Sequence, residues 1–344
     1  MRVLLTGASG FIGSHVSAEL SAHGADVRAF CRTEPPALAQ AREWHAGDVR
    51  DRAAVLAAAT GCDAVIHAAA LYSYARADRG AMWAVNVEGT RNVLEACARR
   101  RVAQVVVTSS SATCGPVPGR PACELDVPPR WERTVPYKRT KLAAERLALR
   151  AAADGAAVVC VNPTTVVGPG DRQPTPSGKM VRDLVAGRMR GYLRCAGLNV
   201  VAVADVARGH RLALERGRPG QRYILGGEDL WLRDAFAAAL RAVGGRPPRL
   251  PLPWWPVYAA AVVAEGLSRV VGREPALLVR DEVRLARLPL FFTSGKARAE
   301  LGYRPRPAAA ALAAAARWFA AQALISDRSD CLRERAVARA AVGS

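Results

Sequence analysis

Apolar runs alternate with helical periods through the first half of the chain. Residues 2–6 form a nearly continuous apolar run, and after a glycine-rich turn Val16 and Leu20 stand four residues apart, as on one face of a helix. Further strands are predicted at residues 26–31, 44–46, 64–68, 104–108 and 157–161, and further helices at 52–59, 81–99 and 136–153. Strands that are apolar almost throughout are buried on both faces of a sheet. The pattern therefore predicts an α/β fold, a doubly wound parallel sheet of the Rossmann type whose ligand crevice lies at the carboxyl ends of the strands.

This alternation breaks down beyond about residue 162, where proline, glycine and arginine interrupt the chain. Residues 200–203 and 223–225 are predicted to be strands that return to the sheet, and residues 230–243, 256–271 and 308–323 to be helices. We therefore expect a Rossmann domain over residues 1–165 and a smaller, mostly helical substrate lobe over residues 166–325. Residues 326–344 are charged and rich in alanine, and we expect them to form a flexible tail.

Composition narrows the range of partners. Of the 49 basic residues only four are lysines, and the arginines are dispersed among alanines with no block of five or more basic residues. The formal charge of +19 thus indicates a compositional bias more than a basic patch. We expect no nucleic-acid binding, whereas a weak attraction to anionic surfaces or phosphorylated substrates stays open.

Cysteine usage and hydropathy bear on the compartment. The eight cysteines stand at irregular spacings without a C-x-x-C pair, so we expect neither a disulfide framework nor a metal site, and a cytoplasmic protein. No run of eighteen uncharged apolar residues occurs, so no transmembrane span is expected. The helix that follows Trp254-Trp255-Pro256 is apolar on most sides. A core helix of the second lobe is its favoured interpretation, and a membrane-surface or partner role is the alternative.

The glycine-rich turn is the first candidate binding site. Gly7, Gly10 and Gly13 form a T-G-x-x-G-x-x-G pattern between a predicted strand and a predicted helix. Such a turn leaves backbone N–H groups at the helix N-terminus, where the helix dipole favours a phosphate. Gly7 would permit the tight turn, Gly10 the approach of a diphosphate, and Gly13 the packing of helix on strand. A purely structural turn is the alternative, which the strand before it and the helix after it make less favoured.

Tyr137 and Lys141 are the first candidate catalytic residues. They stand four residues apart on one predicted helix, so both side chains leave the same face. A phenol with a pKa near 10 exchanges protons poorly at neutral pH unless a cation stabilises its phenolate, and Lys141 can be that cation. The predicted strand at 104–108 ends in a run of hydroxyl residues at 108–111, one of which can donate a hydrogen bond to a substrate oxygen. A surface pair of residues on a helix and loop-capping serines are the structural alternatives.

Together these features resemble the extended short-chain dehydrogenase/reductase superfamily. The resemblance runs from Met1 to about Ala323 and rests on the glycine turn, the serines at 109–111 and Tyr137-x-x-x-Lys141. Supporting motifs are G-D at 47–48, H-A-A-A at 67–70, N-V-E-G-T-R-N-V at 86–93, N-P-T-T-V-V-G-P at 162–169 and L-G-Y-R-P at 301–305. Within the superfamily the chain looks most like the hopanoid-associated sugar epimerase group, a neighbour of dihydroflavonol reductases and 3β-hydroxysteroid dehydrogenases. Residues 168–176 and 223–228 carry that closer match.

The resemblance implies a role for each matching residue. Tyr137 would be the general acid or base. Lys141 would bind the nicotinamide ribose and lower the pKa of Tyr137. Ser110 would polarise the substrate oxygen, with Ser111 as the alternative. The residues that would bind the cofactor are Gly7, Ser9, Gly10, Phe11, Ile12, Gly13, Arg32, Asp48, Val49, Ala68, Ala69, Ala70, Tyr137, Lys141, Pro163 and Thr165.

Three further expectations follow from the same resemblance. Asn86 would order a water or the backbone near the site. Asp205 would tie down the second lobe. The protein would form a homodimer through a four-helix contact that includes the helices predicted at 81–99 and 136–153.

The end of the strand at 26–31 bears on cofactor choice. An enzyme that prefers NAD would present an Asp or Glu there to the adenine ribose, but Phe30-Cys31-Arg32 offers no acid and one guanidinium. Arg32 can stack on adenine and bind a 2′-phosphate, so NADP is favoured and NAD stays possible. An arginine that is merely solvated in the loop is the alternative.

Two reactions and one non-catalytic role fit this pattern. The first reaction is a net hydride transfer between a nicotinamide cofactor and a ketone or secondary alcohol. The second is a sugar-nucleotide epimerase or dehydratase that keeps its cofactor tightly bound. A cofactor sensor without catalysis is less favoured, because the chain retains Ser110, Tyr137 and Lys141. The substrate is a small molecule whose identity the sequence leaves open.

Overall fold

The computed structural model describes residues 1–36, 39–73, 77–271 and 280–323, without the side chains of residues 268–271. Its centre is a seven-stranded parallel sheet in the order β3-β2-β1-β4-β5-β6-β10. The strands are β1 (Arg2–Thr6), β2 (Asp26–Cys31), β3 (Glu43–Ala46), β4 (Ala64–His67), β5 (Gln104–Thr108), β6 (Val158–Pro163) and β10 (Arg222–Leu225). The chain reverses direction across the sheet between β1 and β4, so this is where the ligand crevice of a doubly wound fold lies. The predicted Rossmann-type fold is confirmed.

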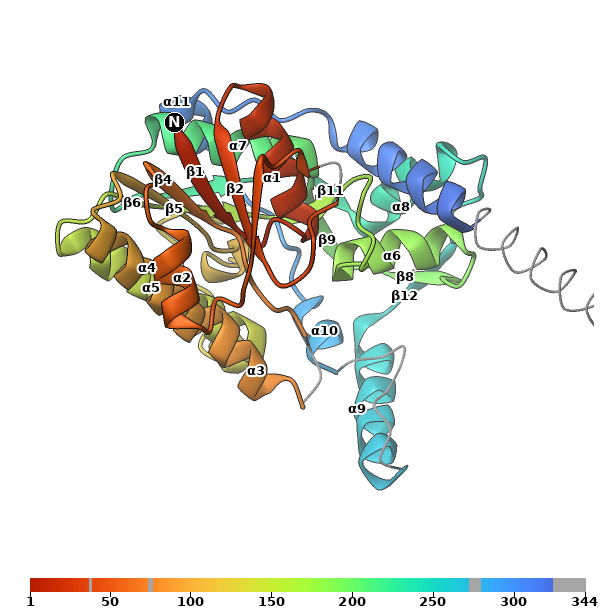
Figure 1. The fold of residues 1–344 in the computed structure, drawn as a ribbon. Helices are drawn as coiled ribbons and strands as arrows, with labels where there is room; N and C mark the ends of the chain where they lie inside the picture. The colour runs from red at the N-terminus through yellow and green to blue at the C-terminus, as the bar shows by residue number, and fades with distance from the viewer. Residues whose placement is uncertain (37–38, 74–76, 272–279, 324–344) are drawn as a thin grey trace, which may run out of the picture.

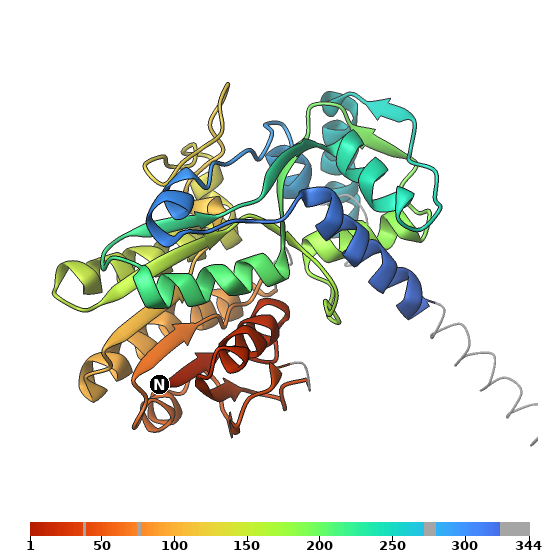
Figure 2. The same cartoon turned by 90° about the horizontal axis from the view of Figure 1, so that it is seen from above.

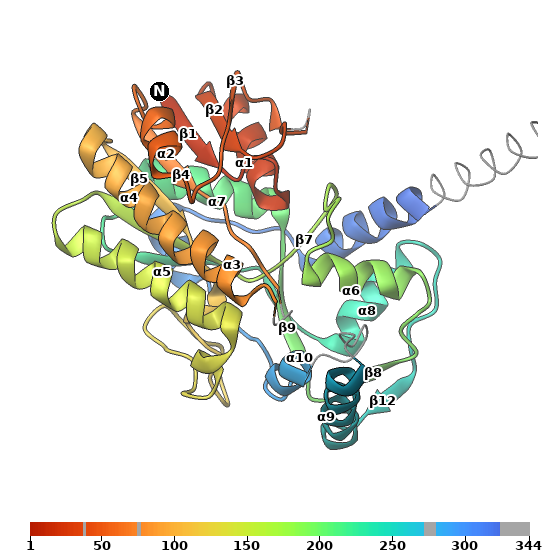
Figure 3. The same cartoon turned by 60° about the horizontal axis from the view of Figure 1, so that its bottom comes forward.

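Helices cover both faces of this sheet (Figures 1 and 3). One face carries α1 (Phe11–Ala22), α7 (Val203–Arg216) and α11 (Gly295–Leu301). The other carries α2 (Arg52–Ala58), α4 (Gly89–Arg100) and α5 (Pro136–Ala153). Successive strand residues contribute to the two cores in turn: Val3 and Leu5 to the first, Leu4 to the second. This two-sided burial is why the strands are apolar almost throughout.

Local sequence signals set several helix ends. The Asp51 carboxylate caps α2, since it accepts hydrogen bonds from the backbone N–H groups of Ala53 (2.9 Å) and Ala54 (3.0 Å). Pro136 occupies the first turn of α5, where its missing N–H costs nothing. These signals explain why α2 and α5 begin at the predicted residues.

The C-terminal lobe contains two small sheets and several helices. A three-stranded sheet has the order β11-β9-β7, and a two-stranded parallel sheet pairs β12 with β8. The strands are β7 (Thr165–Val167), β8 (Gly191–Leu193), β9 (Gly197–Ala202), β11 (Glu228–Trp231) and β12 (Leu250–Leu252). The helices are α6 (Pro176–Val185), α8 (Leu232–Arg241), α9 (Trp254–Val271), α10 (Arg280–Leu285) and residues 308–323.

One apolar cluster holds this lobe together. Leu184 of α6 and Phe236 of α8 pack with Leu312 and Phe319 of the last helix, which lies against the lobe in Figure 2. Asp205 at the start of α7 accepts hydrogen bonds from the backbone N–H (2.8 Å) and the guanidinium (3.0 Å) of Arg306. Asp205 thus ties down the segment before the last helix, as predicted. In the described parts of the chain no helix is both long enough and apolar enough to cross a membrane.

Four predictions need correction: three about the second half of the chain and one about the helix predicted at 81–99. Residues 200–203 do not return to the central sheet, because β10 already occupies the free edge of β6, and β9 pairs instead with β7 and β11. Residues 230–231 belong to β11, so α8 begins later than predicted. The predicted helix at 81–99 is divided into α3 (Arg79–Trp83), a π turn (Ala84–Glu88) and α4.

The helix predicted at 256–271 is the fourth correction. It begins at Trp254 and is no core helix, because its outer side stands in solvent, with Trp255 70% exposed. The predicted flexible tail, residues 326–344, lies outside the described residues.

Candidate functional site

The glycine turn between β1 and α1 is built for close approach. Gly7 has φ +73°, and a Cβ there would lie 2.7 Å from the Ala69 Cα at the end of β4. A Cβ on Gly13 would lie 2.1 Å from the Gly7 carbonyl oxygen, so helix and strand can pack this tightly only with glycine there. Gly10 is the N-cap of α1 and supplies no side-chain cap. The first-turn N–H groups of α1, at Phe11 and Ile12, therefore have no competing side-chain acceptor, and this cradle fits a diphosphate.

The adenosine end of the predicted cofactor site lies beyond β2 and β3. Ser9 of the turn lies against Cys31, and exposed Arg32 follows immediately. The Asp48 carboxylate accepts two hydrogen bonds from the Arg50 guanidinium (3.0 and 2.7 Å), which lowers the pKa of Asp48, and Arg32 acts on it in the same direction. The end of β2 thus presents a guanidinium, and the Asp48 carboxylate is already paired with Arg50. Val49 is buried in the core beside these residues.

The three alanines after β4 form the wall next to the glycine turn. The backbone N–H of Ala68 donates to the Thr6 carbonyl oxygen (3.2 Å), and that of Ala69 donates to the Thr6 hydroxyl (3.3 Å). Ala70 is exposed. Buried His67 lies within hydrogen-bond distance of the hydroxyls of Thr6 (2.7 Å) and Thr90 (3.0 Å). Burial lowers the pKa of His67 to about 3, so a neutral imidazole joins the ends of β1 and β4.

Ser110 and Tyr137 meet at the carboxyl end of β5. Ser110 lies two residues beyond the end of β5 and caps the 3₁₀ turn at 111–113, and its Oγ accepts a hydrogen bond from the Ala112 N–H (3.2 Å). The Ser110 hydroxyl hydrogen is therefore left to hydrogen-bond the Tyr137 oxygen. Burial raises the pKa of Tyr137 to about 12, and this hydrogen bond opposes the rise. The pKa is thus raised overall, not lowered as the resemblance implies, because burial of the phenol outweighs the stabilisation of its anion.

Lys141 lies one helical turn beyond Tyr137 and is 5% exposed. Its Nζ donates a hydrogen bond to the Thr108 carbonyl oxygen (2.8 Å), which fixes the ammonium at the end of β5. Burial lowers the pKa of Lys141 to about 8, and the nearby Glu145 carboxylate works in the opposite direction. The side chain is therefore mostly protonated at neutral pH.

Sequence reasoning missed a buried polar cluster behind these residues. Asn162 Nδ2 donates to the Glu145 carboxylate (2.6 Å) and to the Ser110 carbonyl oxygen (3.1 Å), and the Thr113 hydroxyl lies 2.9 Å from the same carboxylate. Arg222 of β10 completes the cluster with an ion pair to Glu145 (2.9 Å). The cluster holds the Ser110 backbone from behind. The only local signal for it is the position of Glu145, one helical turn beyond Lys141.

Tyr72 is a second residue that the sequence did not single out. Its ring packs on that of Tyr137 at a centroid distance of 4.1 Å and an interplanar angle of 51°. Asn86 sets this loop in place, since its side chain accepts from the Leu71 N–H (2.7 Å) and donates to the Leu71 carbonyl oxygen (2.9 Å). Asn86 therefore orders backbone near the site, one of the two roles predicted for it, and it does so from the π turn.

The remaining predicted residues lie at the same edge of the sheet. Pro163 ends β6 and is buried, and Thr165 begins β7. Ser111 is buried in the 3₁₀ turn, so Ser110 is the serine beside Tyr137. The motif at 168–176 has a structural function, since buried Asp171 accepts hydrogen bonds from the backbone N–H (3.0 Å) and hydroxyl (2.6 Å) of Thr175, which caps α6.

Comparison with known proteins agrees with this geometry. Residues 3–226 match the model of the NAD dependent epimerase/dehydratase family. The chain is 35% identical over 323 residues to a protein of Synechocystis sp. named putative dihydroflavonol 4-reductase. The aligned region covers 92% of this chain and 93% of the relative. It is 32% identical to sterol demethylase protein B of Methylococcus capsulatus, over 94% of this chain and all of the relative.

A solved structure supports the same assignment. The structure of MoeE5 in complex with UDP-glucuronic acid and NAD is 27% identical and superposes with a TM-score of 0.73, over 94% of this chain and 100% of MoeE5. This chain is an enzyme of the NAD-dependent epimerase/dehydratase family, within the extended short-chain dehydrogenases/reductases.

Proposed function

We propose that this enzyme is an NADP-preferring reductase that interconverts a ketone and a secondary alcohol. One observation supports this most: the Tyr137 phenol, hydrogen-bonded to Ser110 and one turn from the Lys141 ammonium, lies beside the loop that packs on the glycine cradle. Bound nicotinamide would supply the hydride to the carbonyl carbon. The residues of the chain would then bind the substrate oxygen and deliver a proton to it.

The pKa values suit proton donation. With a pKa near 12, Tyr137 holds its proton throughout the physiological range and is ready to act as a general acid. The phenolate that develops when the proton leaves would be stabilised by the Ser110 hydroxyl and the Lys141 ammonium. Tyr72 covers one side of the Tyr137 ring and helps to keep water from it.

Arg32 supports the preference for NADP. It follows β2 at the position where an acid would bind the ribose hydroxyls, and a 2′-phosphate there would find a free guanidinium. We expect Arg32→Asp to raise the KM for NADPH about tenfold or more and to change the KM for NADH far less. Arg99→Asp, on the exposed end of α4, is the matched control and should leave both values unchanged. Equal KM values for the two cofactors in the wild type would reject the preference.

A sugar-nucleotide epimerase is the second candidate, because MoeE5 binds UDP-glucuronic acid and NAD. The pairing of three arginines beyond residue 180 weighs against it. Arg222 is paired with Glu145, and Arg182 and Arg188 are both bound to Asp183 (3.0 and 3.2 Å). These three guanidinium groups are therefore engaged within the protein and would have to leave their carboxylates to bind a diphosphate.

The two reactions differ in net cofactor consumption. We would follow NADPH absorbance with a panel of cyclic and polycyclic ketones, and UDP-glucose isomers by NMR, with Tyr137→Phe as the inactive control. Stoichiometric NADPH oxidation that requires Tyr137 supports the reductase. Isomer formation without NADPH oxidation would replace the reductase with the epimerase.

We further propose a cytoplasmic homodimer. Its interface would lie on the outer faces of α3, α4 and α5. There Arg139 of α5 lies 5.4 Å from the centre of the ring of Trp83 in α3, and a cavity of about 200 Å³ is lined by Leu142 and Arg146. The seven cysteines in the described residues are free, which suits a reducing compartment. Light scattering should give a particle mass of twice the 36.6 kDa chain mass, and Trp83→Glu should reduce the particle mass to that of a single chain.

A further inference from the structure

The outer side of α9 carries an uncharged stripe between Trp255 and Leu267. Among the residues of this helix whose side chains the structure describes, the exposed ones recur at helical spacing over more than three turns, and none of them carries a charge. They are Trp255, Ala259, Ala260, Val262, Val263, Gly266 and Leu267. Trp255 is 70% exposed, Val263 60% and Leu267 61%, in a chain where 23% of residues are charged. From Trp255 to Leu267 this α9 stripe extends about 18 Å along the helix axis.

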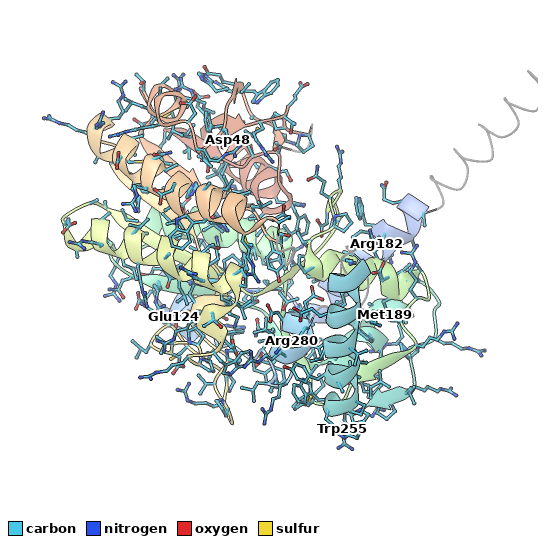
Figure 4. The ribbon with its side chains drawn as sticks, turned by 90° about the horizontal axis from the view of Figure 1, so that it is seen from below. Asp48, Glu124, Arg182, Met189, Trp255 and Arg280 are labelled. Atoms are coloured by element: carbon cyan, nitrogen blue, oxygen red, sulfur yellow. The ribbon has the colours of Figure 1, made fainter. Side chains whose placement is uncertain are left out.

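The stripe is exposed because α9 packs on the protein through its opposite side. Its inner side packs on α10: Trp254 Nε1 donates to the Val283 carbonyl oxygen (2.7 Å), and the Trp254 and Tyr258 rings stack at 4.7 Å. Arg280 adds a hydrogen bond to the Tyr258 hydroxyl (3.3 Å) and an ion pair with Glu265 (3.6 Å). Trp254, Tyr258 and Glu265 thus face the protein, and Trp255, Val263 and Leu267 face outward. Figure 1 shows α9 projecting from the lobe, and Figure 4 places Trp255 at the outer edge of the molecule.

The surface next to the stripe is basic. β12, which pairs with β8, leads directly into α9, and the segments that contain the two strands, residues 186–194 and 242–253, have no Asp or Glu. Five arginines of these segments are exposed: Arg188, which is paired with Asp183, and Arg190, Arg194, Arg246 and Arg249. Leu250 of β12 is a further exposed apolar residue, at 57% exposure. Arg287 lies 5.4 Å from the centre of the Trp254 ring and adds a further positive charge near the N-terminal end of α9.

We propose that the α9 stripe docks this enzyme on the surface of a bilayer that contains anionic lipids. An apolar helix face with tryptophan at one end enters the interface between headgroups and acyl chains, where indole rings are favoured. The exposed arginines that flank β8 and β12 meet the anionic headgroups, whose attraction acts within a Debye length of the surface. A second copy of the chain fits this face less well, because a two-fold contact would bring two sets of arginines together.

Vesicle sedimentation tests this proposal without reference to the reaction. We expect the full-length protein to sediment with vesicles of phosphatidylcholine and phosphatidylglycerol, and much less with phosphatidylcholine alone or at high salt. Val263→Glu/Leu267→Glu should reduce the partition coefficient about tenfold or more, because two acidic groups would enter an apolar, anionic environment. Leu125→Glu/Val127→Glu is the matched control, since both side chains are exposed in a loop outside the stripe. Circular dichroism would verify that both variants are folded.

Four outcomes would overturn the proposal. In the first, the protein does not sediment with anionic vesicles. In the second, it sediments equally with vesicles of phosphatidylcholine alone, and in the third, the control variant loses as much binding as the stripe variant. The fourth is a halving of the particle mass in solution by Val263→Glu/Leu267→Glu, which would make the stripe an interface between copies of the chain. Selective loss of binding in the stripe variant, with the mass unchanged, supports it.

Discussion

The helices α5 and α9 are each eighteen residues long and are opposite in character. α5 carries basic and acidic residues, yet Lys138, Lys141 and Glu145 are buried in it. α9 is largely apolar, yet its outer side is exposed. The contrast teaches that the environment of a helix depends on the partners its side chains find: the buried charges of α5 are paired inside the protein, whereas the apolar residues on the outer side of α9 face solvent.

Pairing explains why α5 can bury its charges. Glu145 has Arg222, Asn162 and Thr113 within hydrogen-bond distance, and Lys141 has the Thr108 carbonyl oxygen. Lys138 is paired with buried Glu132 and also donates to the Gly115 carbonyl oxygen (3.1 Å). Burial of a charge is costly unless it is paired and hydrogen-bonded in this way. The buried charges of α5 are therefore expected to be sensitive to substitution, and the exposed apolar residues of α9 insensitive.

Removal of the phenol oxygen should have the largest effect. Tyr137→Phe keeps the ring that packs against Tyr72 and loses the hydroxyl next to Ser110. We expect kcat for ketone reduction to fall about a thousandfold, because the general acid is gone, with little change in the thermal midpoint. Steady-state kinetics and calorimetry on the same preparation would measure both. Full turnover in this variant would show that α5 does not carry the chemistry.

Removal of the cation from the buried cluster should have the next largest effect. Arg222→Leu leaves the Glu145 carboxylate without its ion-pair partner, and we expect the free energy of unfolding to drop by about 3 kcal/mol. The double variant Glu145→Gln/Arg222→Leu removes both charges and should recover part of that loss. Denaturant titration would measure the three proteins. Wild-type stability in the single variant would contradict the importance given to this pair.

A rise of pH above 8 should have a smaller effect on catalysis. Burial lowers the pKa of Lys141 to about 8, so its ammonium is present below that pH and is lost as pH rises through it. We expect kcat/KM for reduction to be flat below pH 8 and to fall by up to about tenfold per unit above it, since Tyr137 stays protonated to about 12. Glu145→Gln should move the break to lower pH, because Glu145 raises the pKa of Lys141. A break unchanged by this substitution would assign it to another group.

The smallest effect is expected on α9. Because Val263 and Leu267 are mostly exposed, Val263→Glu and Leu267→Glu should each change the free energy of unfolding by less than about 0.5 kcal/mol. Denaturant titration without lipid would measure this. A loss of 2 kcal/mol or more in either variant would show that the stripe is packed in solution, and the contrast with α5 would fail.

The sequence by itself determined the features that depend on the spacing of residues within one strand, turn or helix. Alternating apolar runs predicted the parallel sheet, the glycine spacing predicted the cradle at Gly7, and the four-residue step from Tyr137 predicted its neighbour Lys141. These succeed because strand and helix periods fix which side chains share a face over a few residues.

Only the tertiary structure decided the contacts between distant segments. It placed Ser110 and not Ser111 beside Tyr137, stacked Tyr72 on that ring, and joined Arg222 to Glu145 across 77 residues of sequence. It also put β9 outside the central sheet and turned the apolar side of α9 outward. The physical reason is that such contacts depend on strand order, register and the orientation of packed helices. No local period of the sequence encodes these.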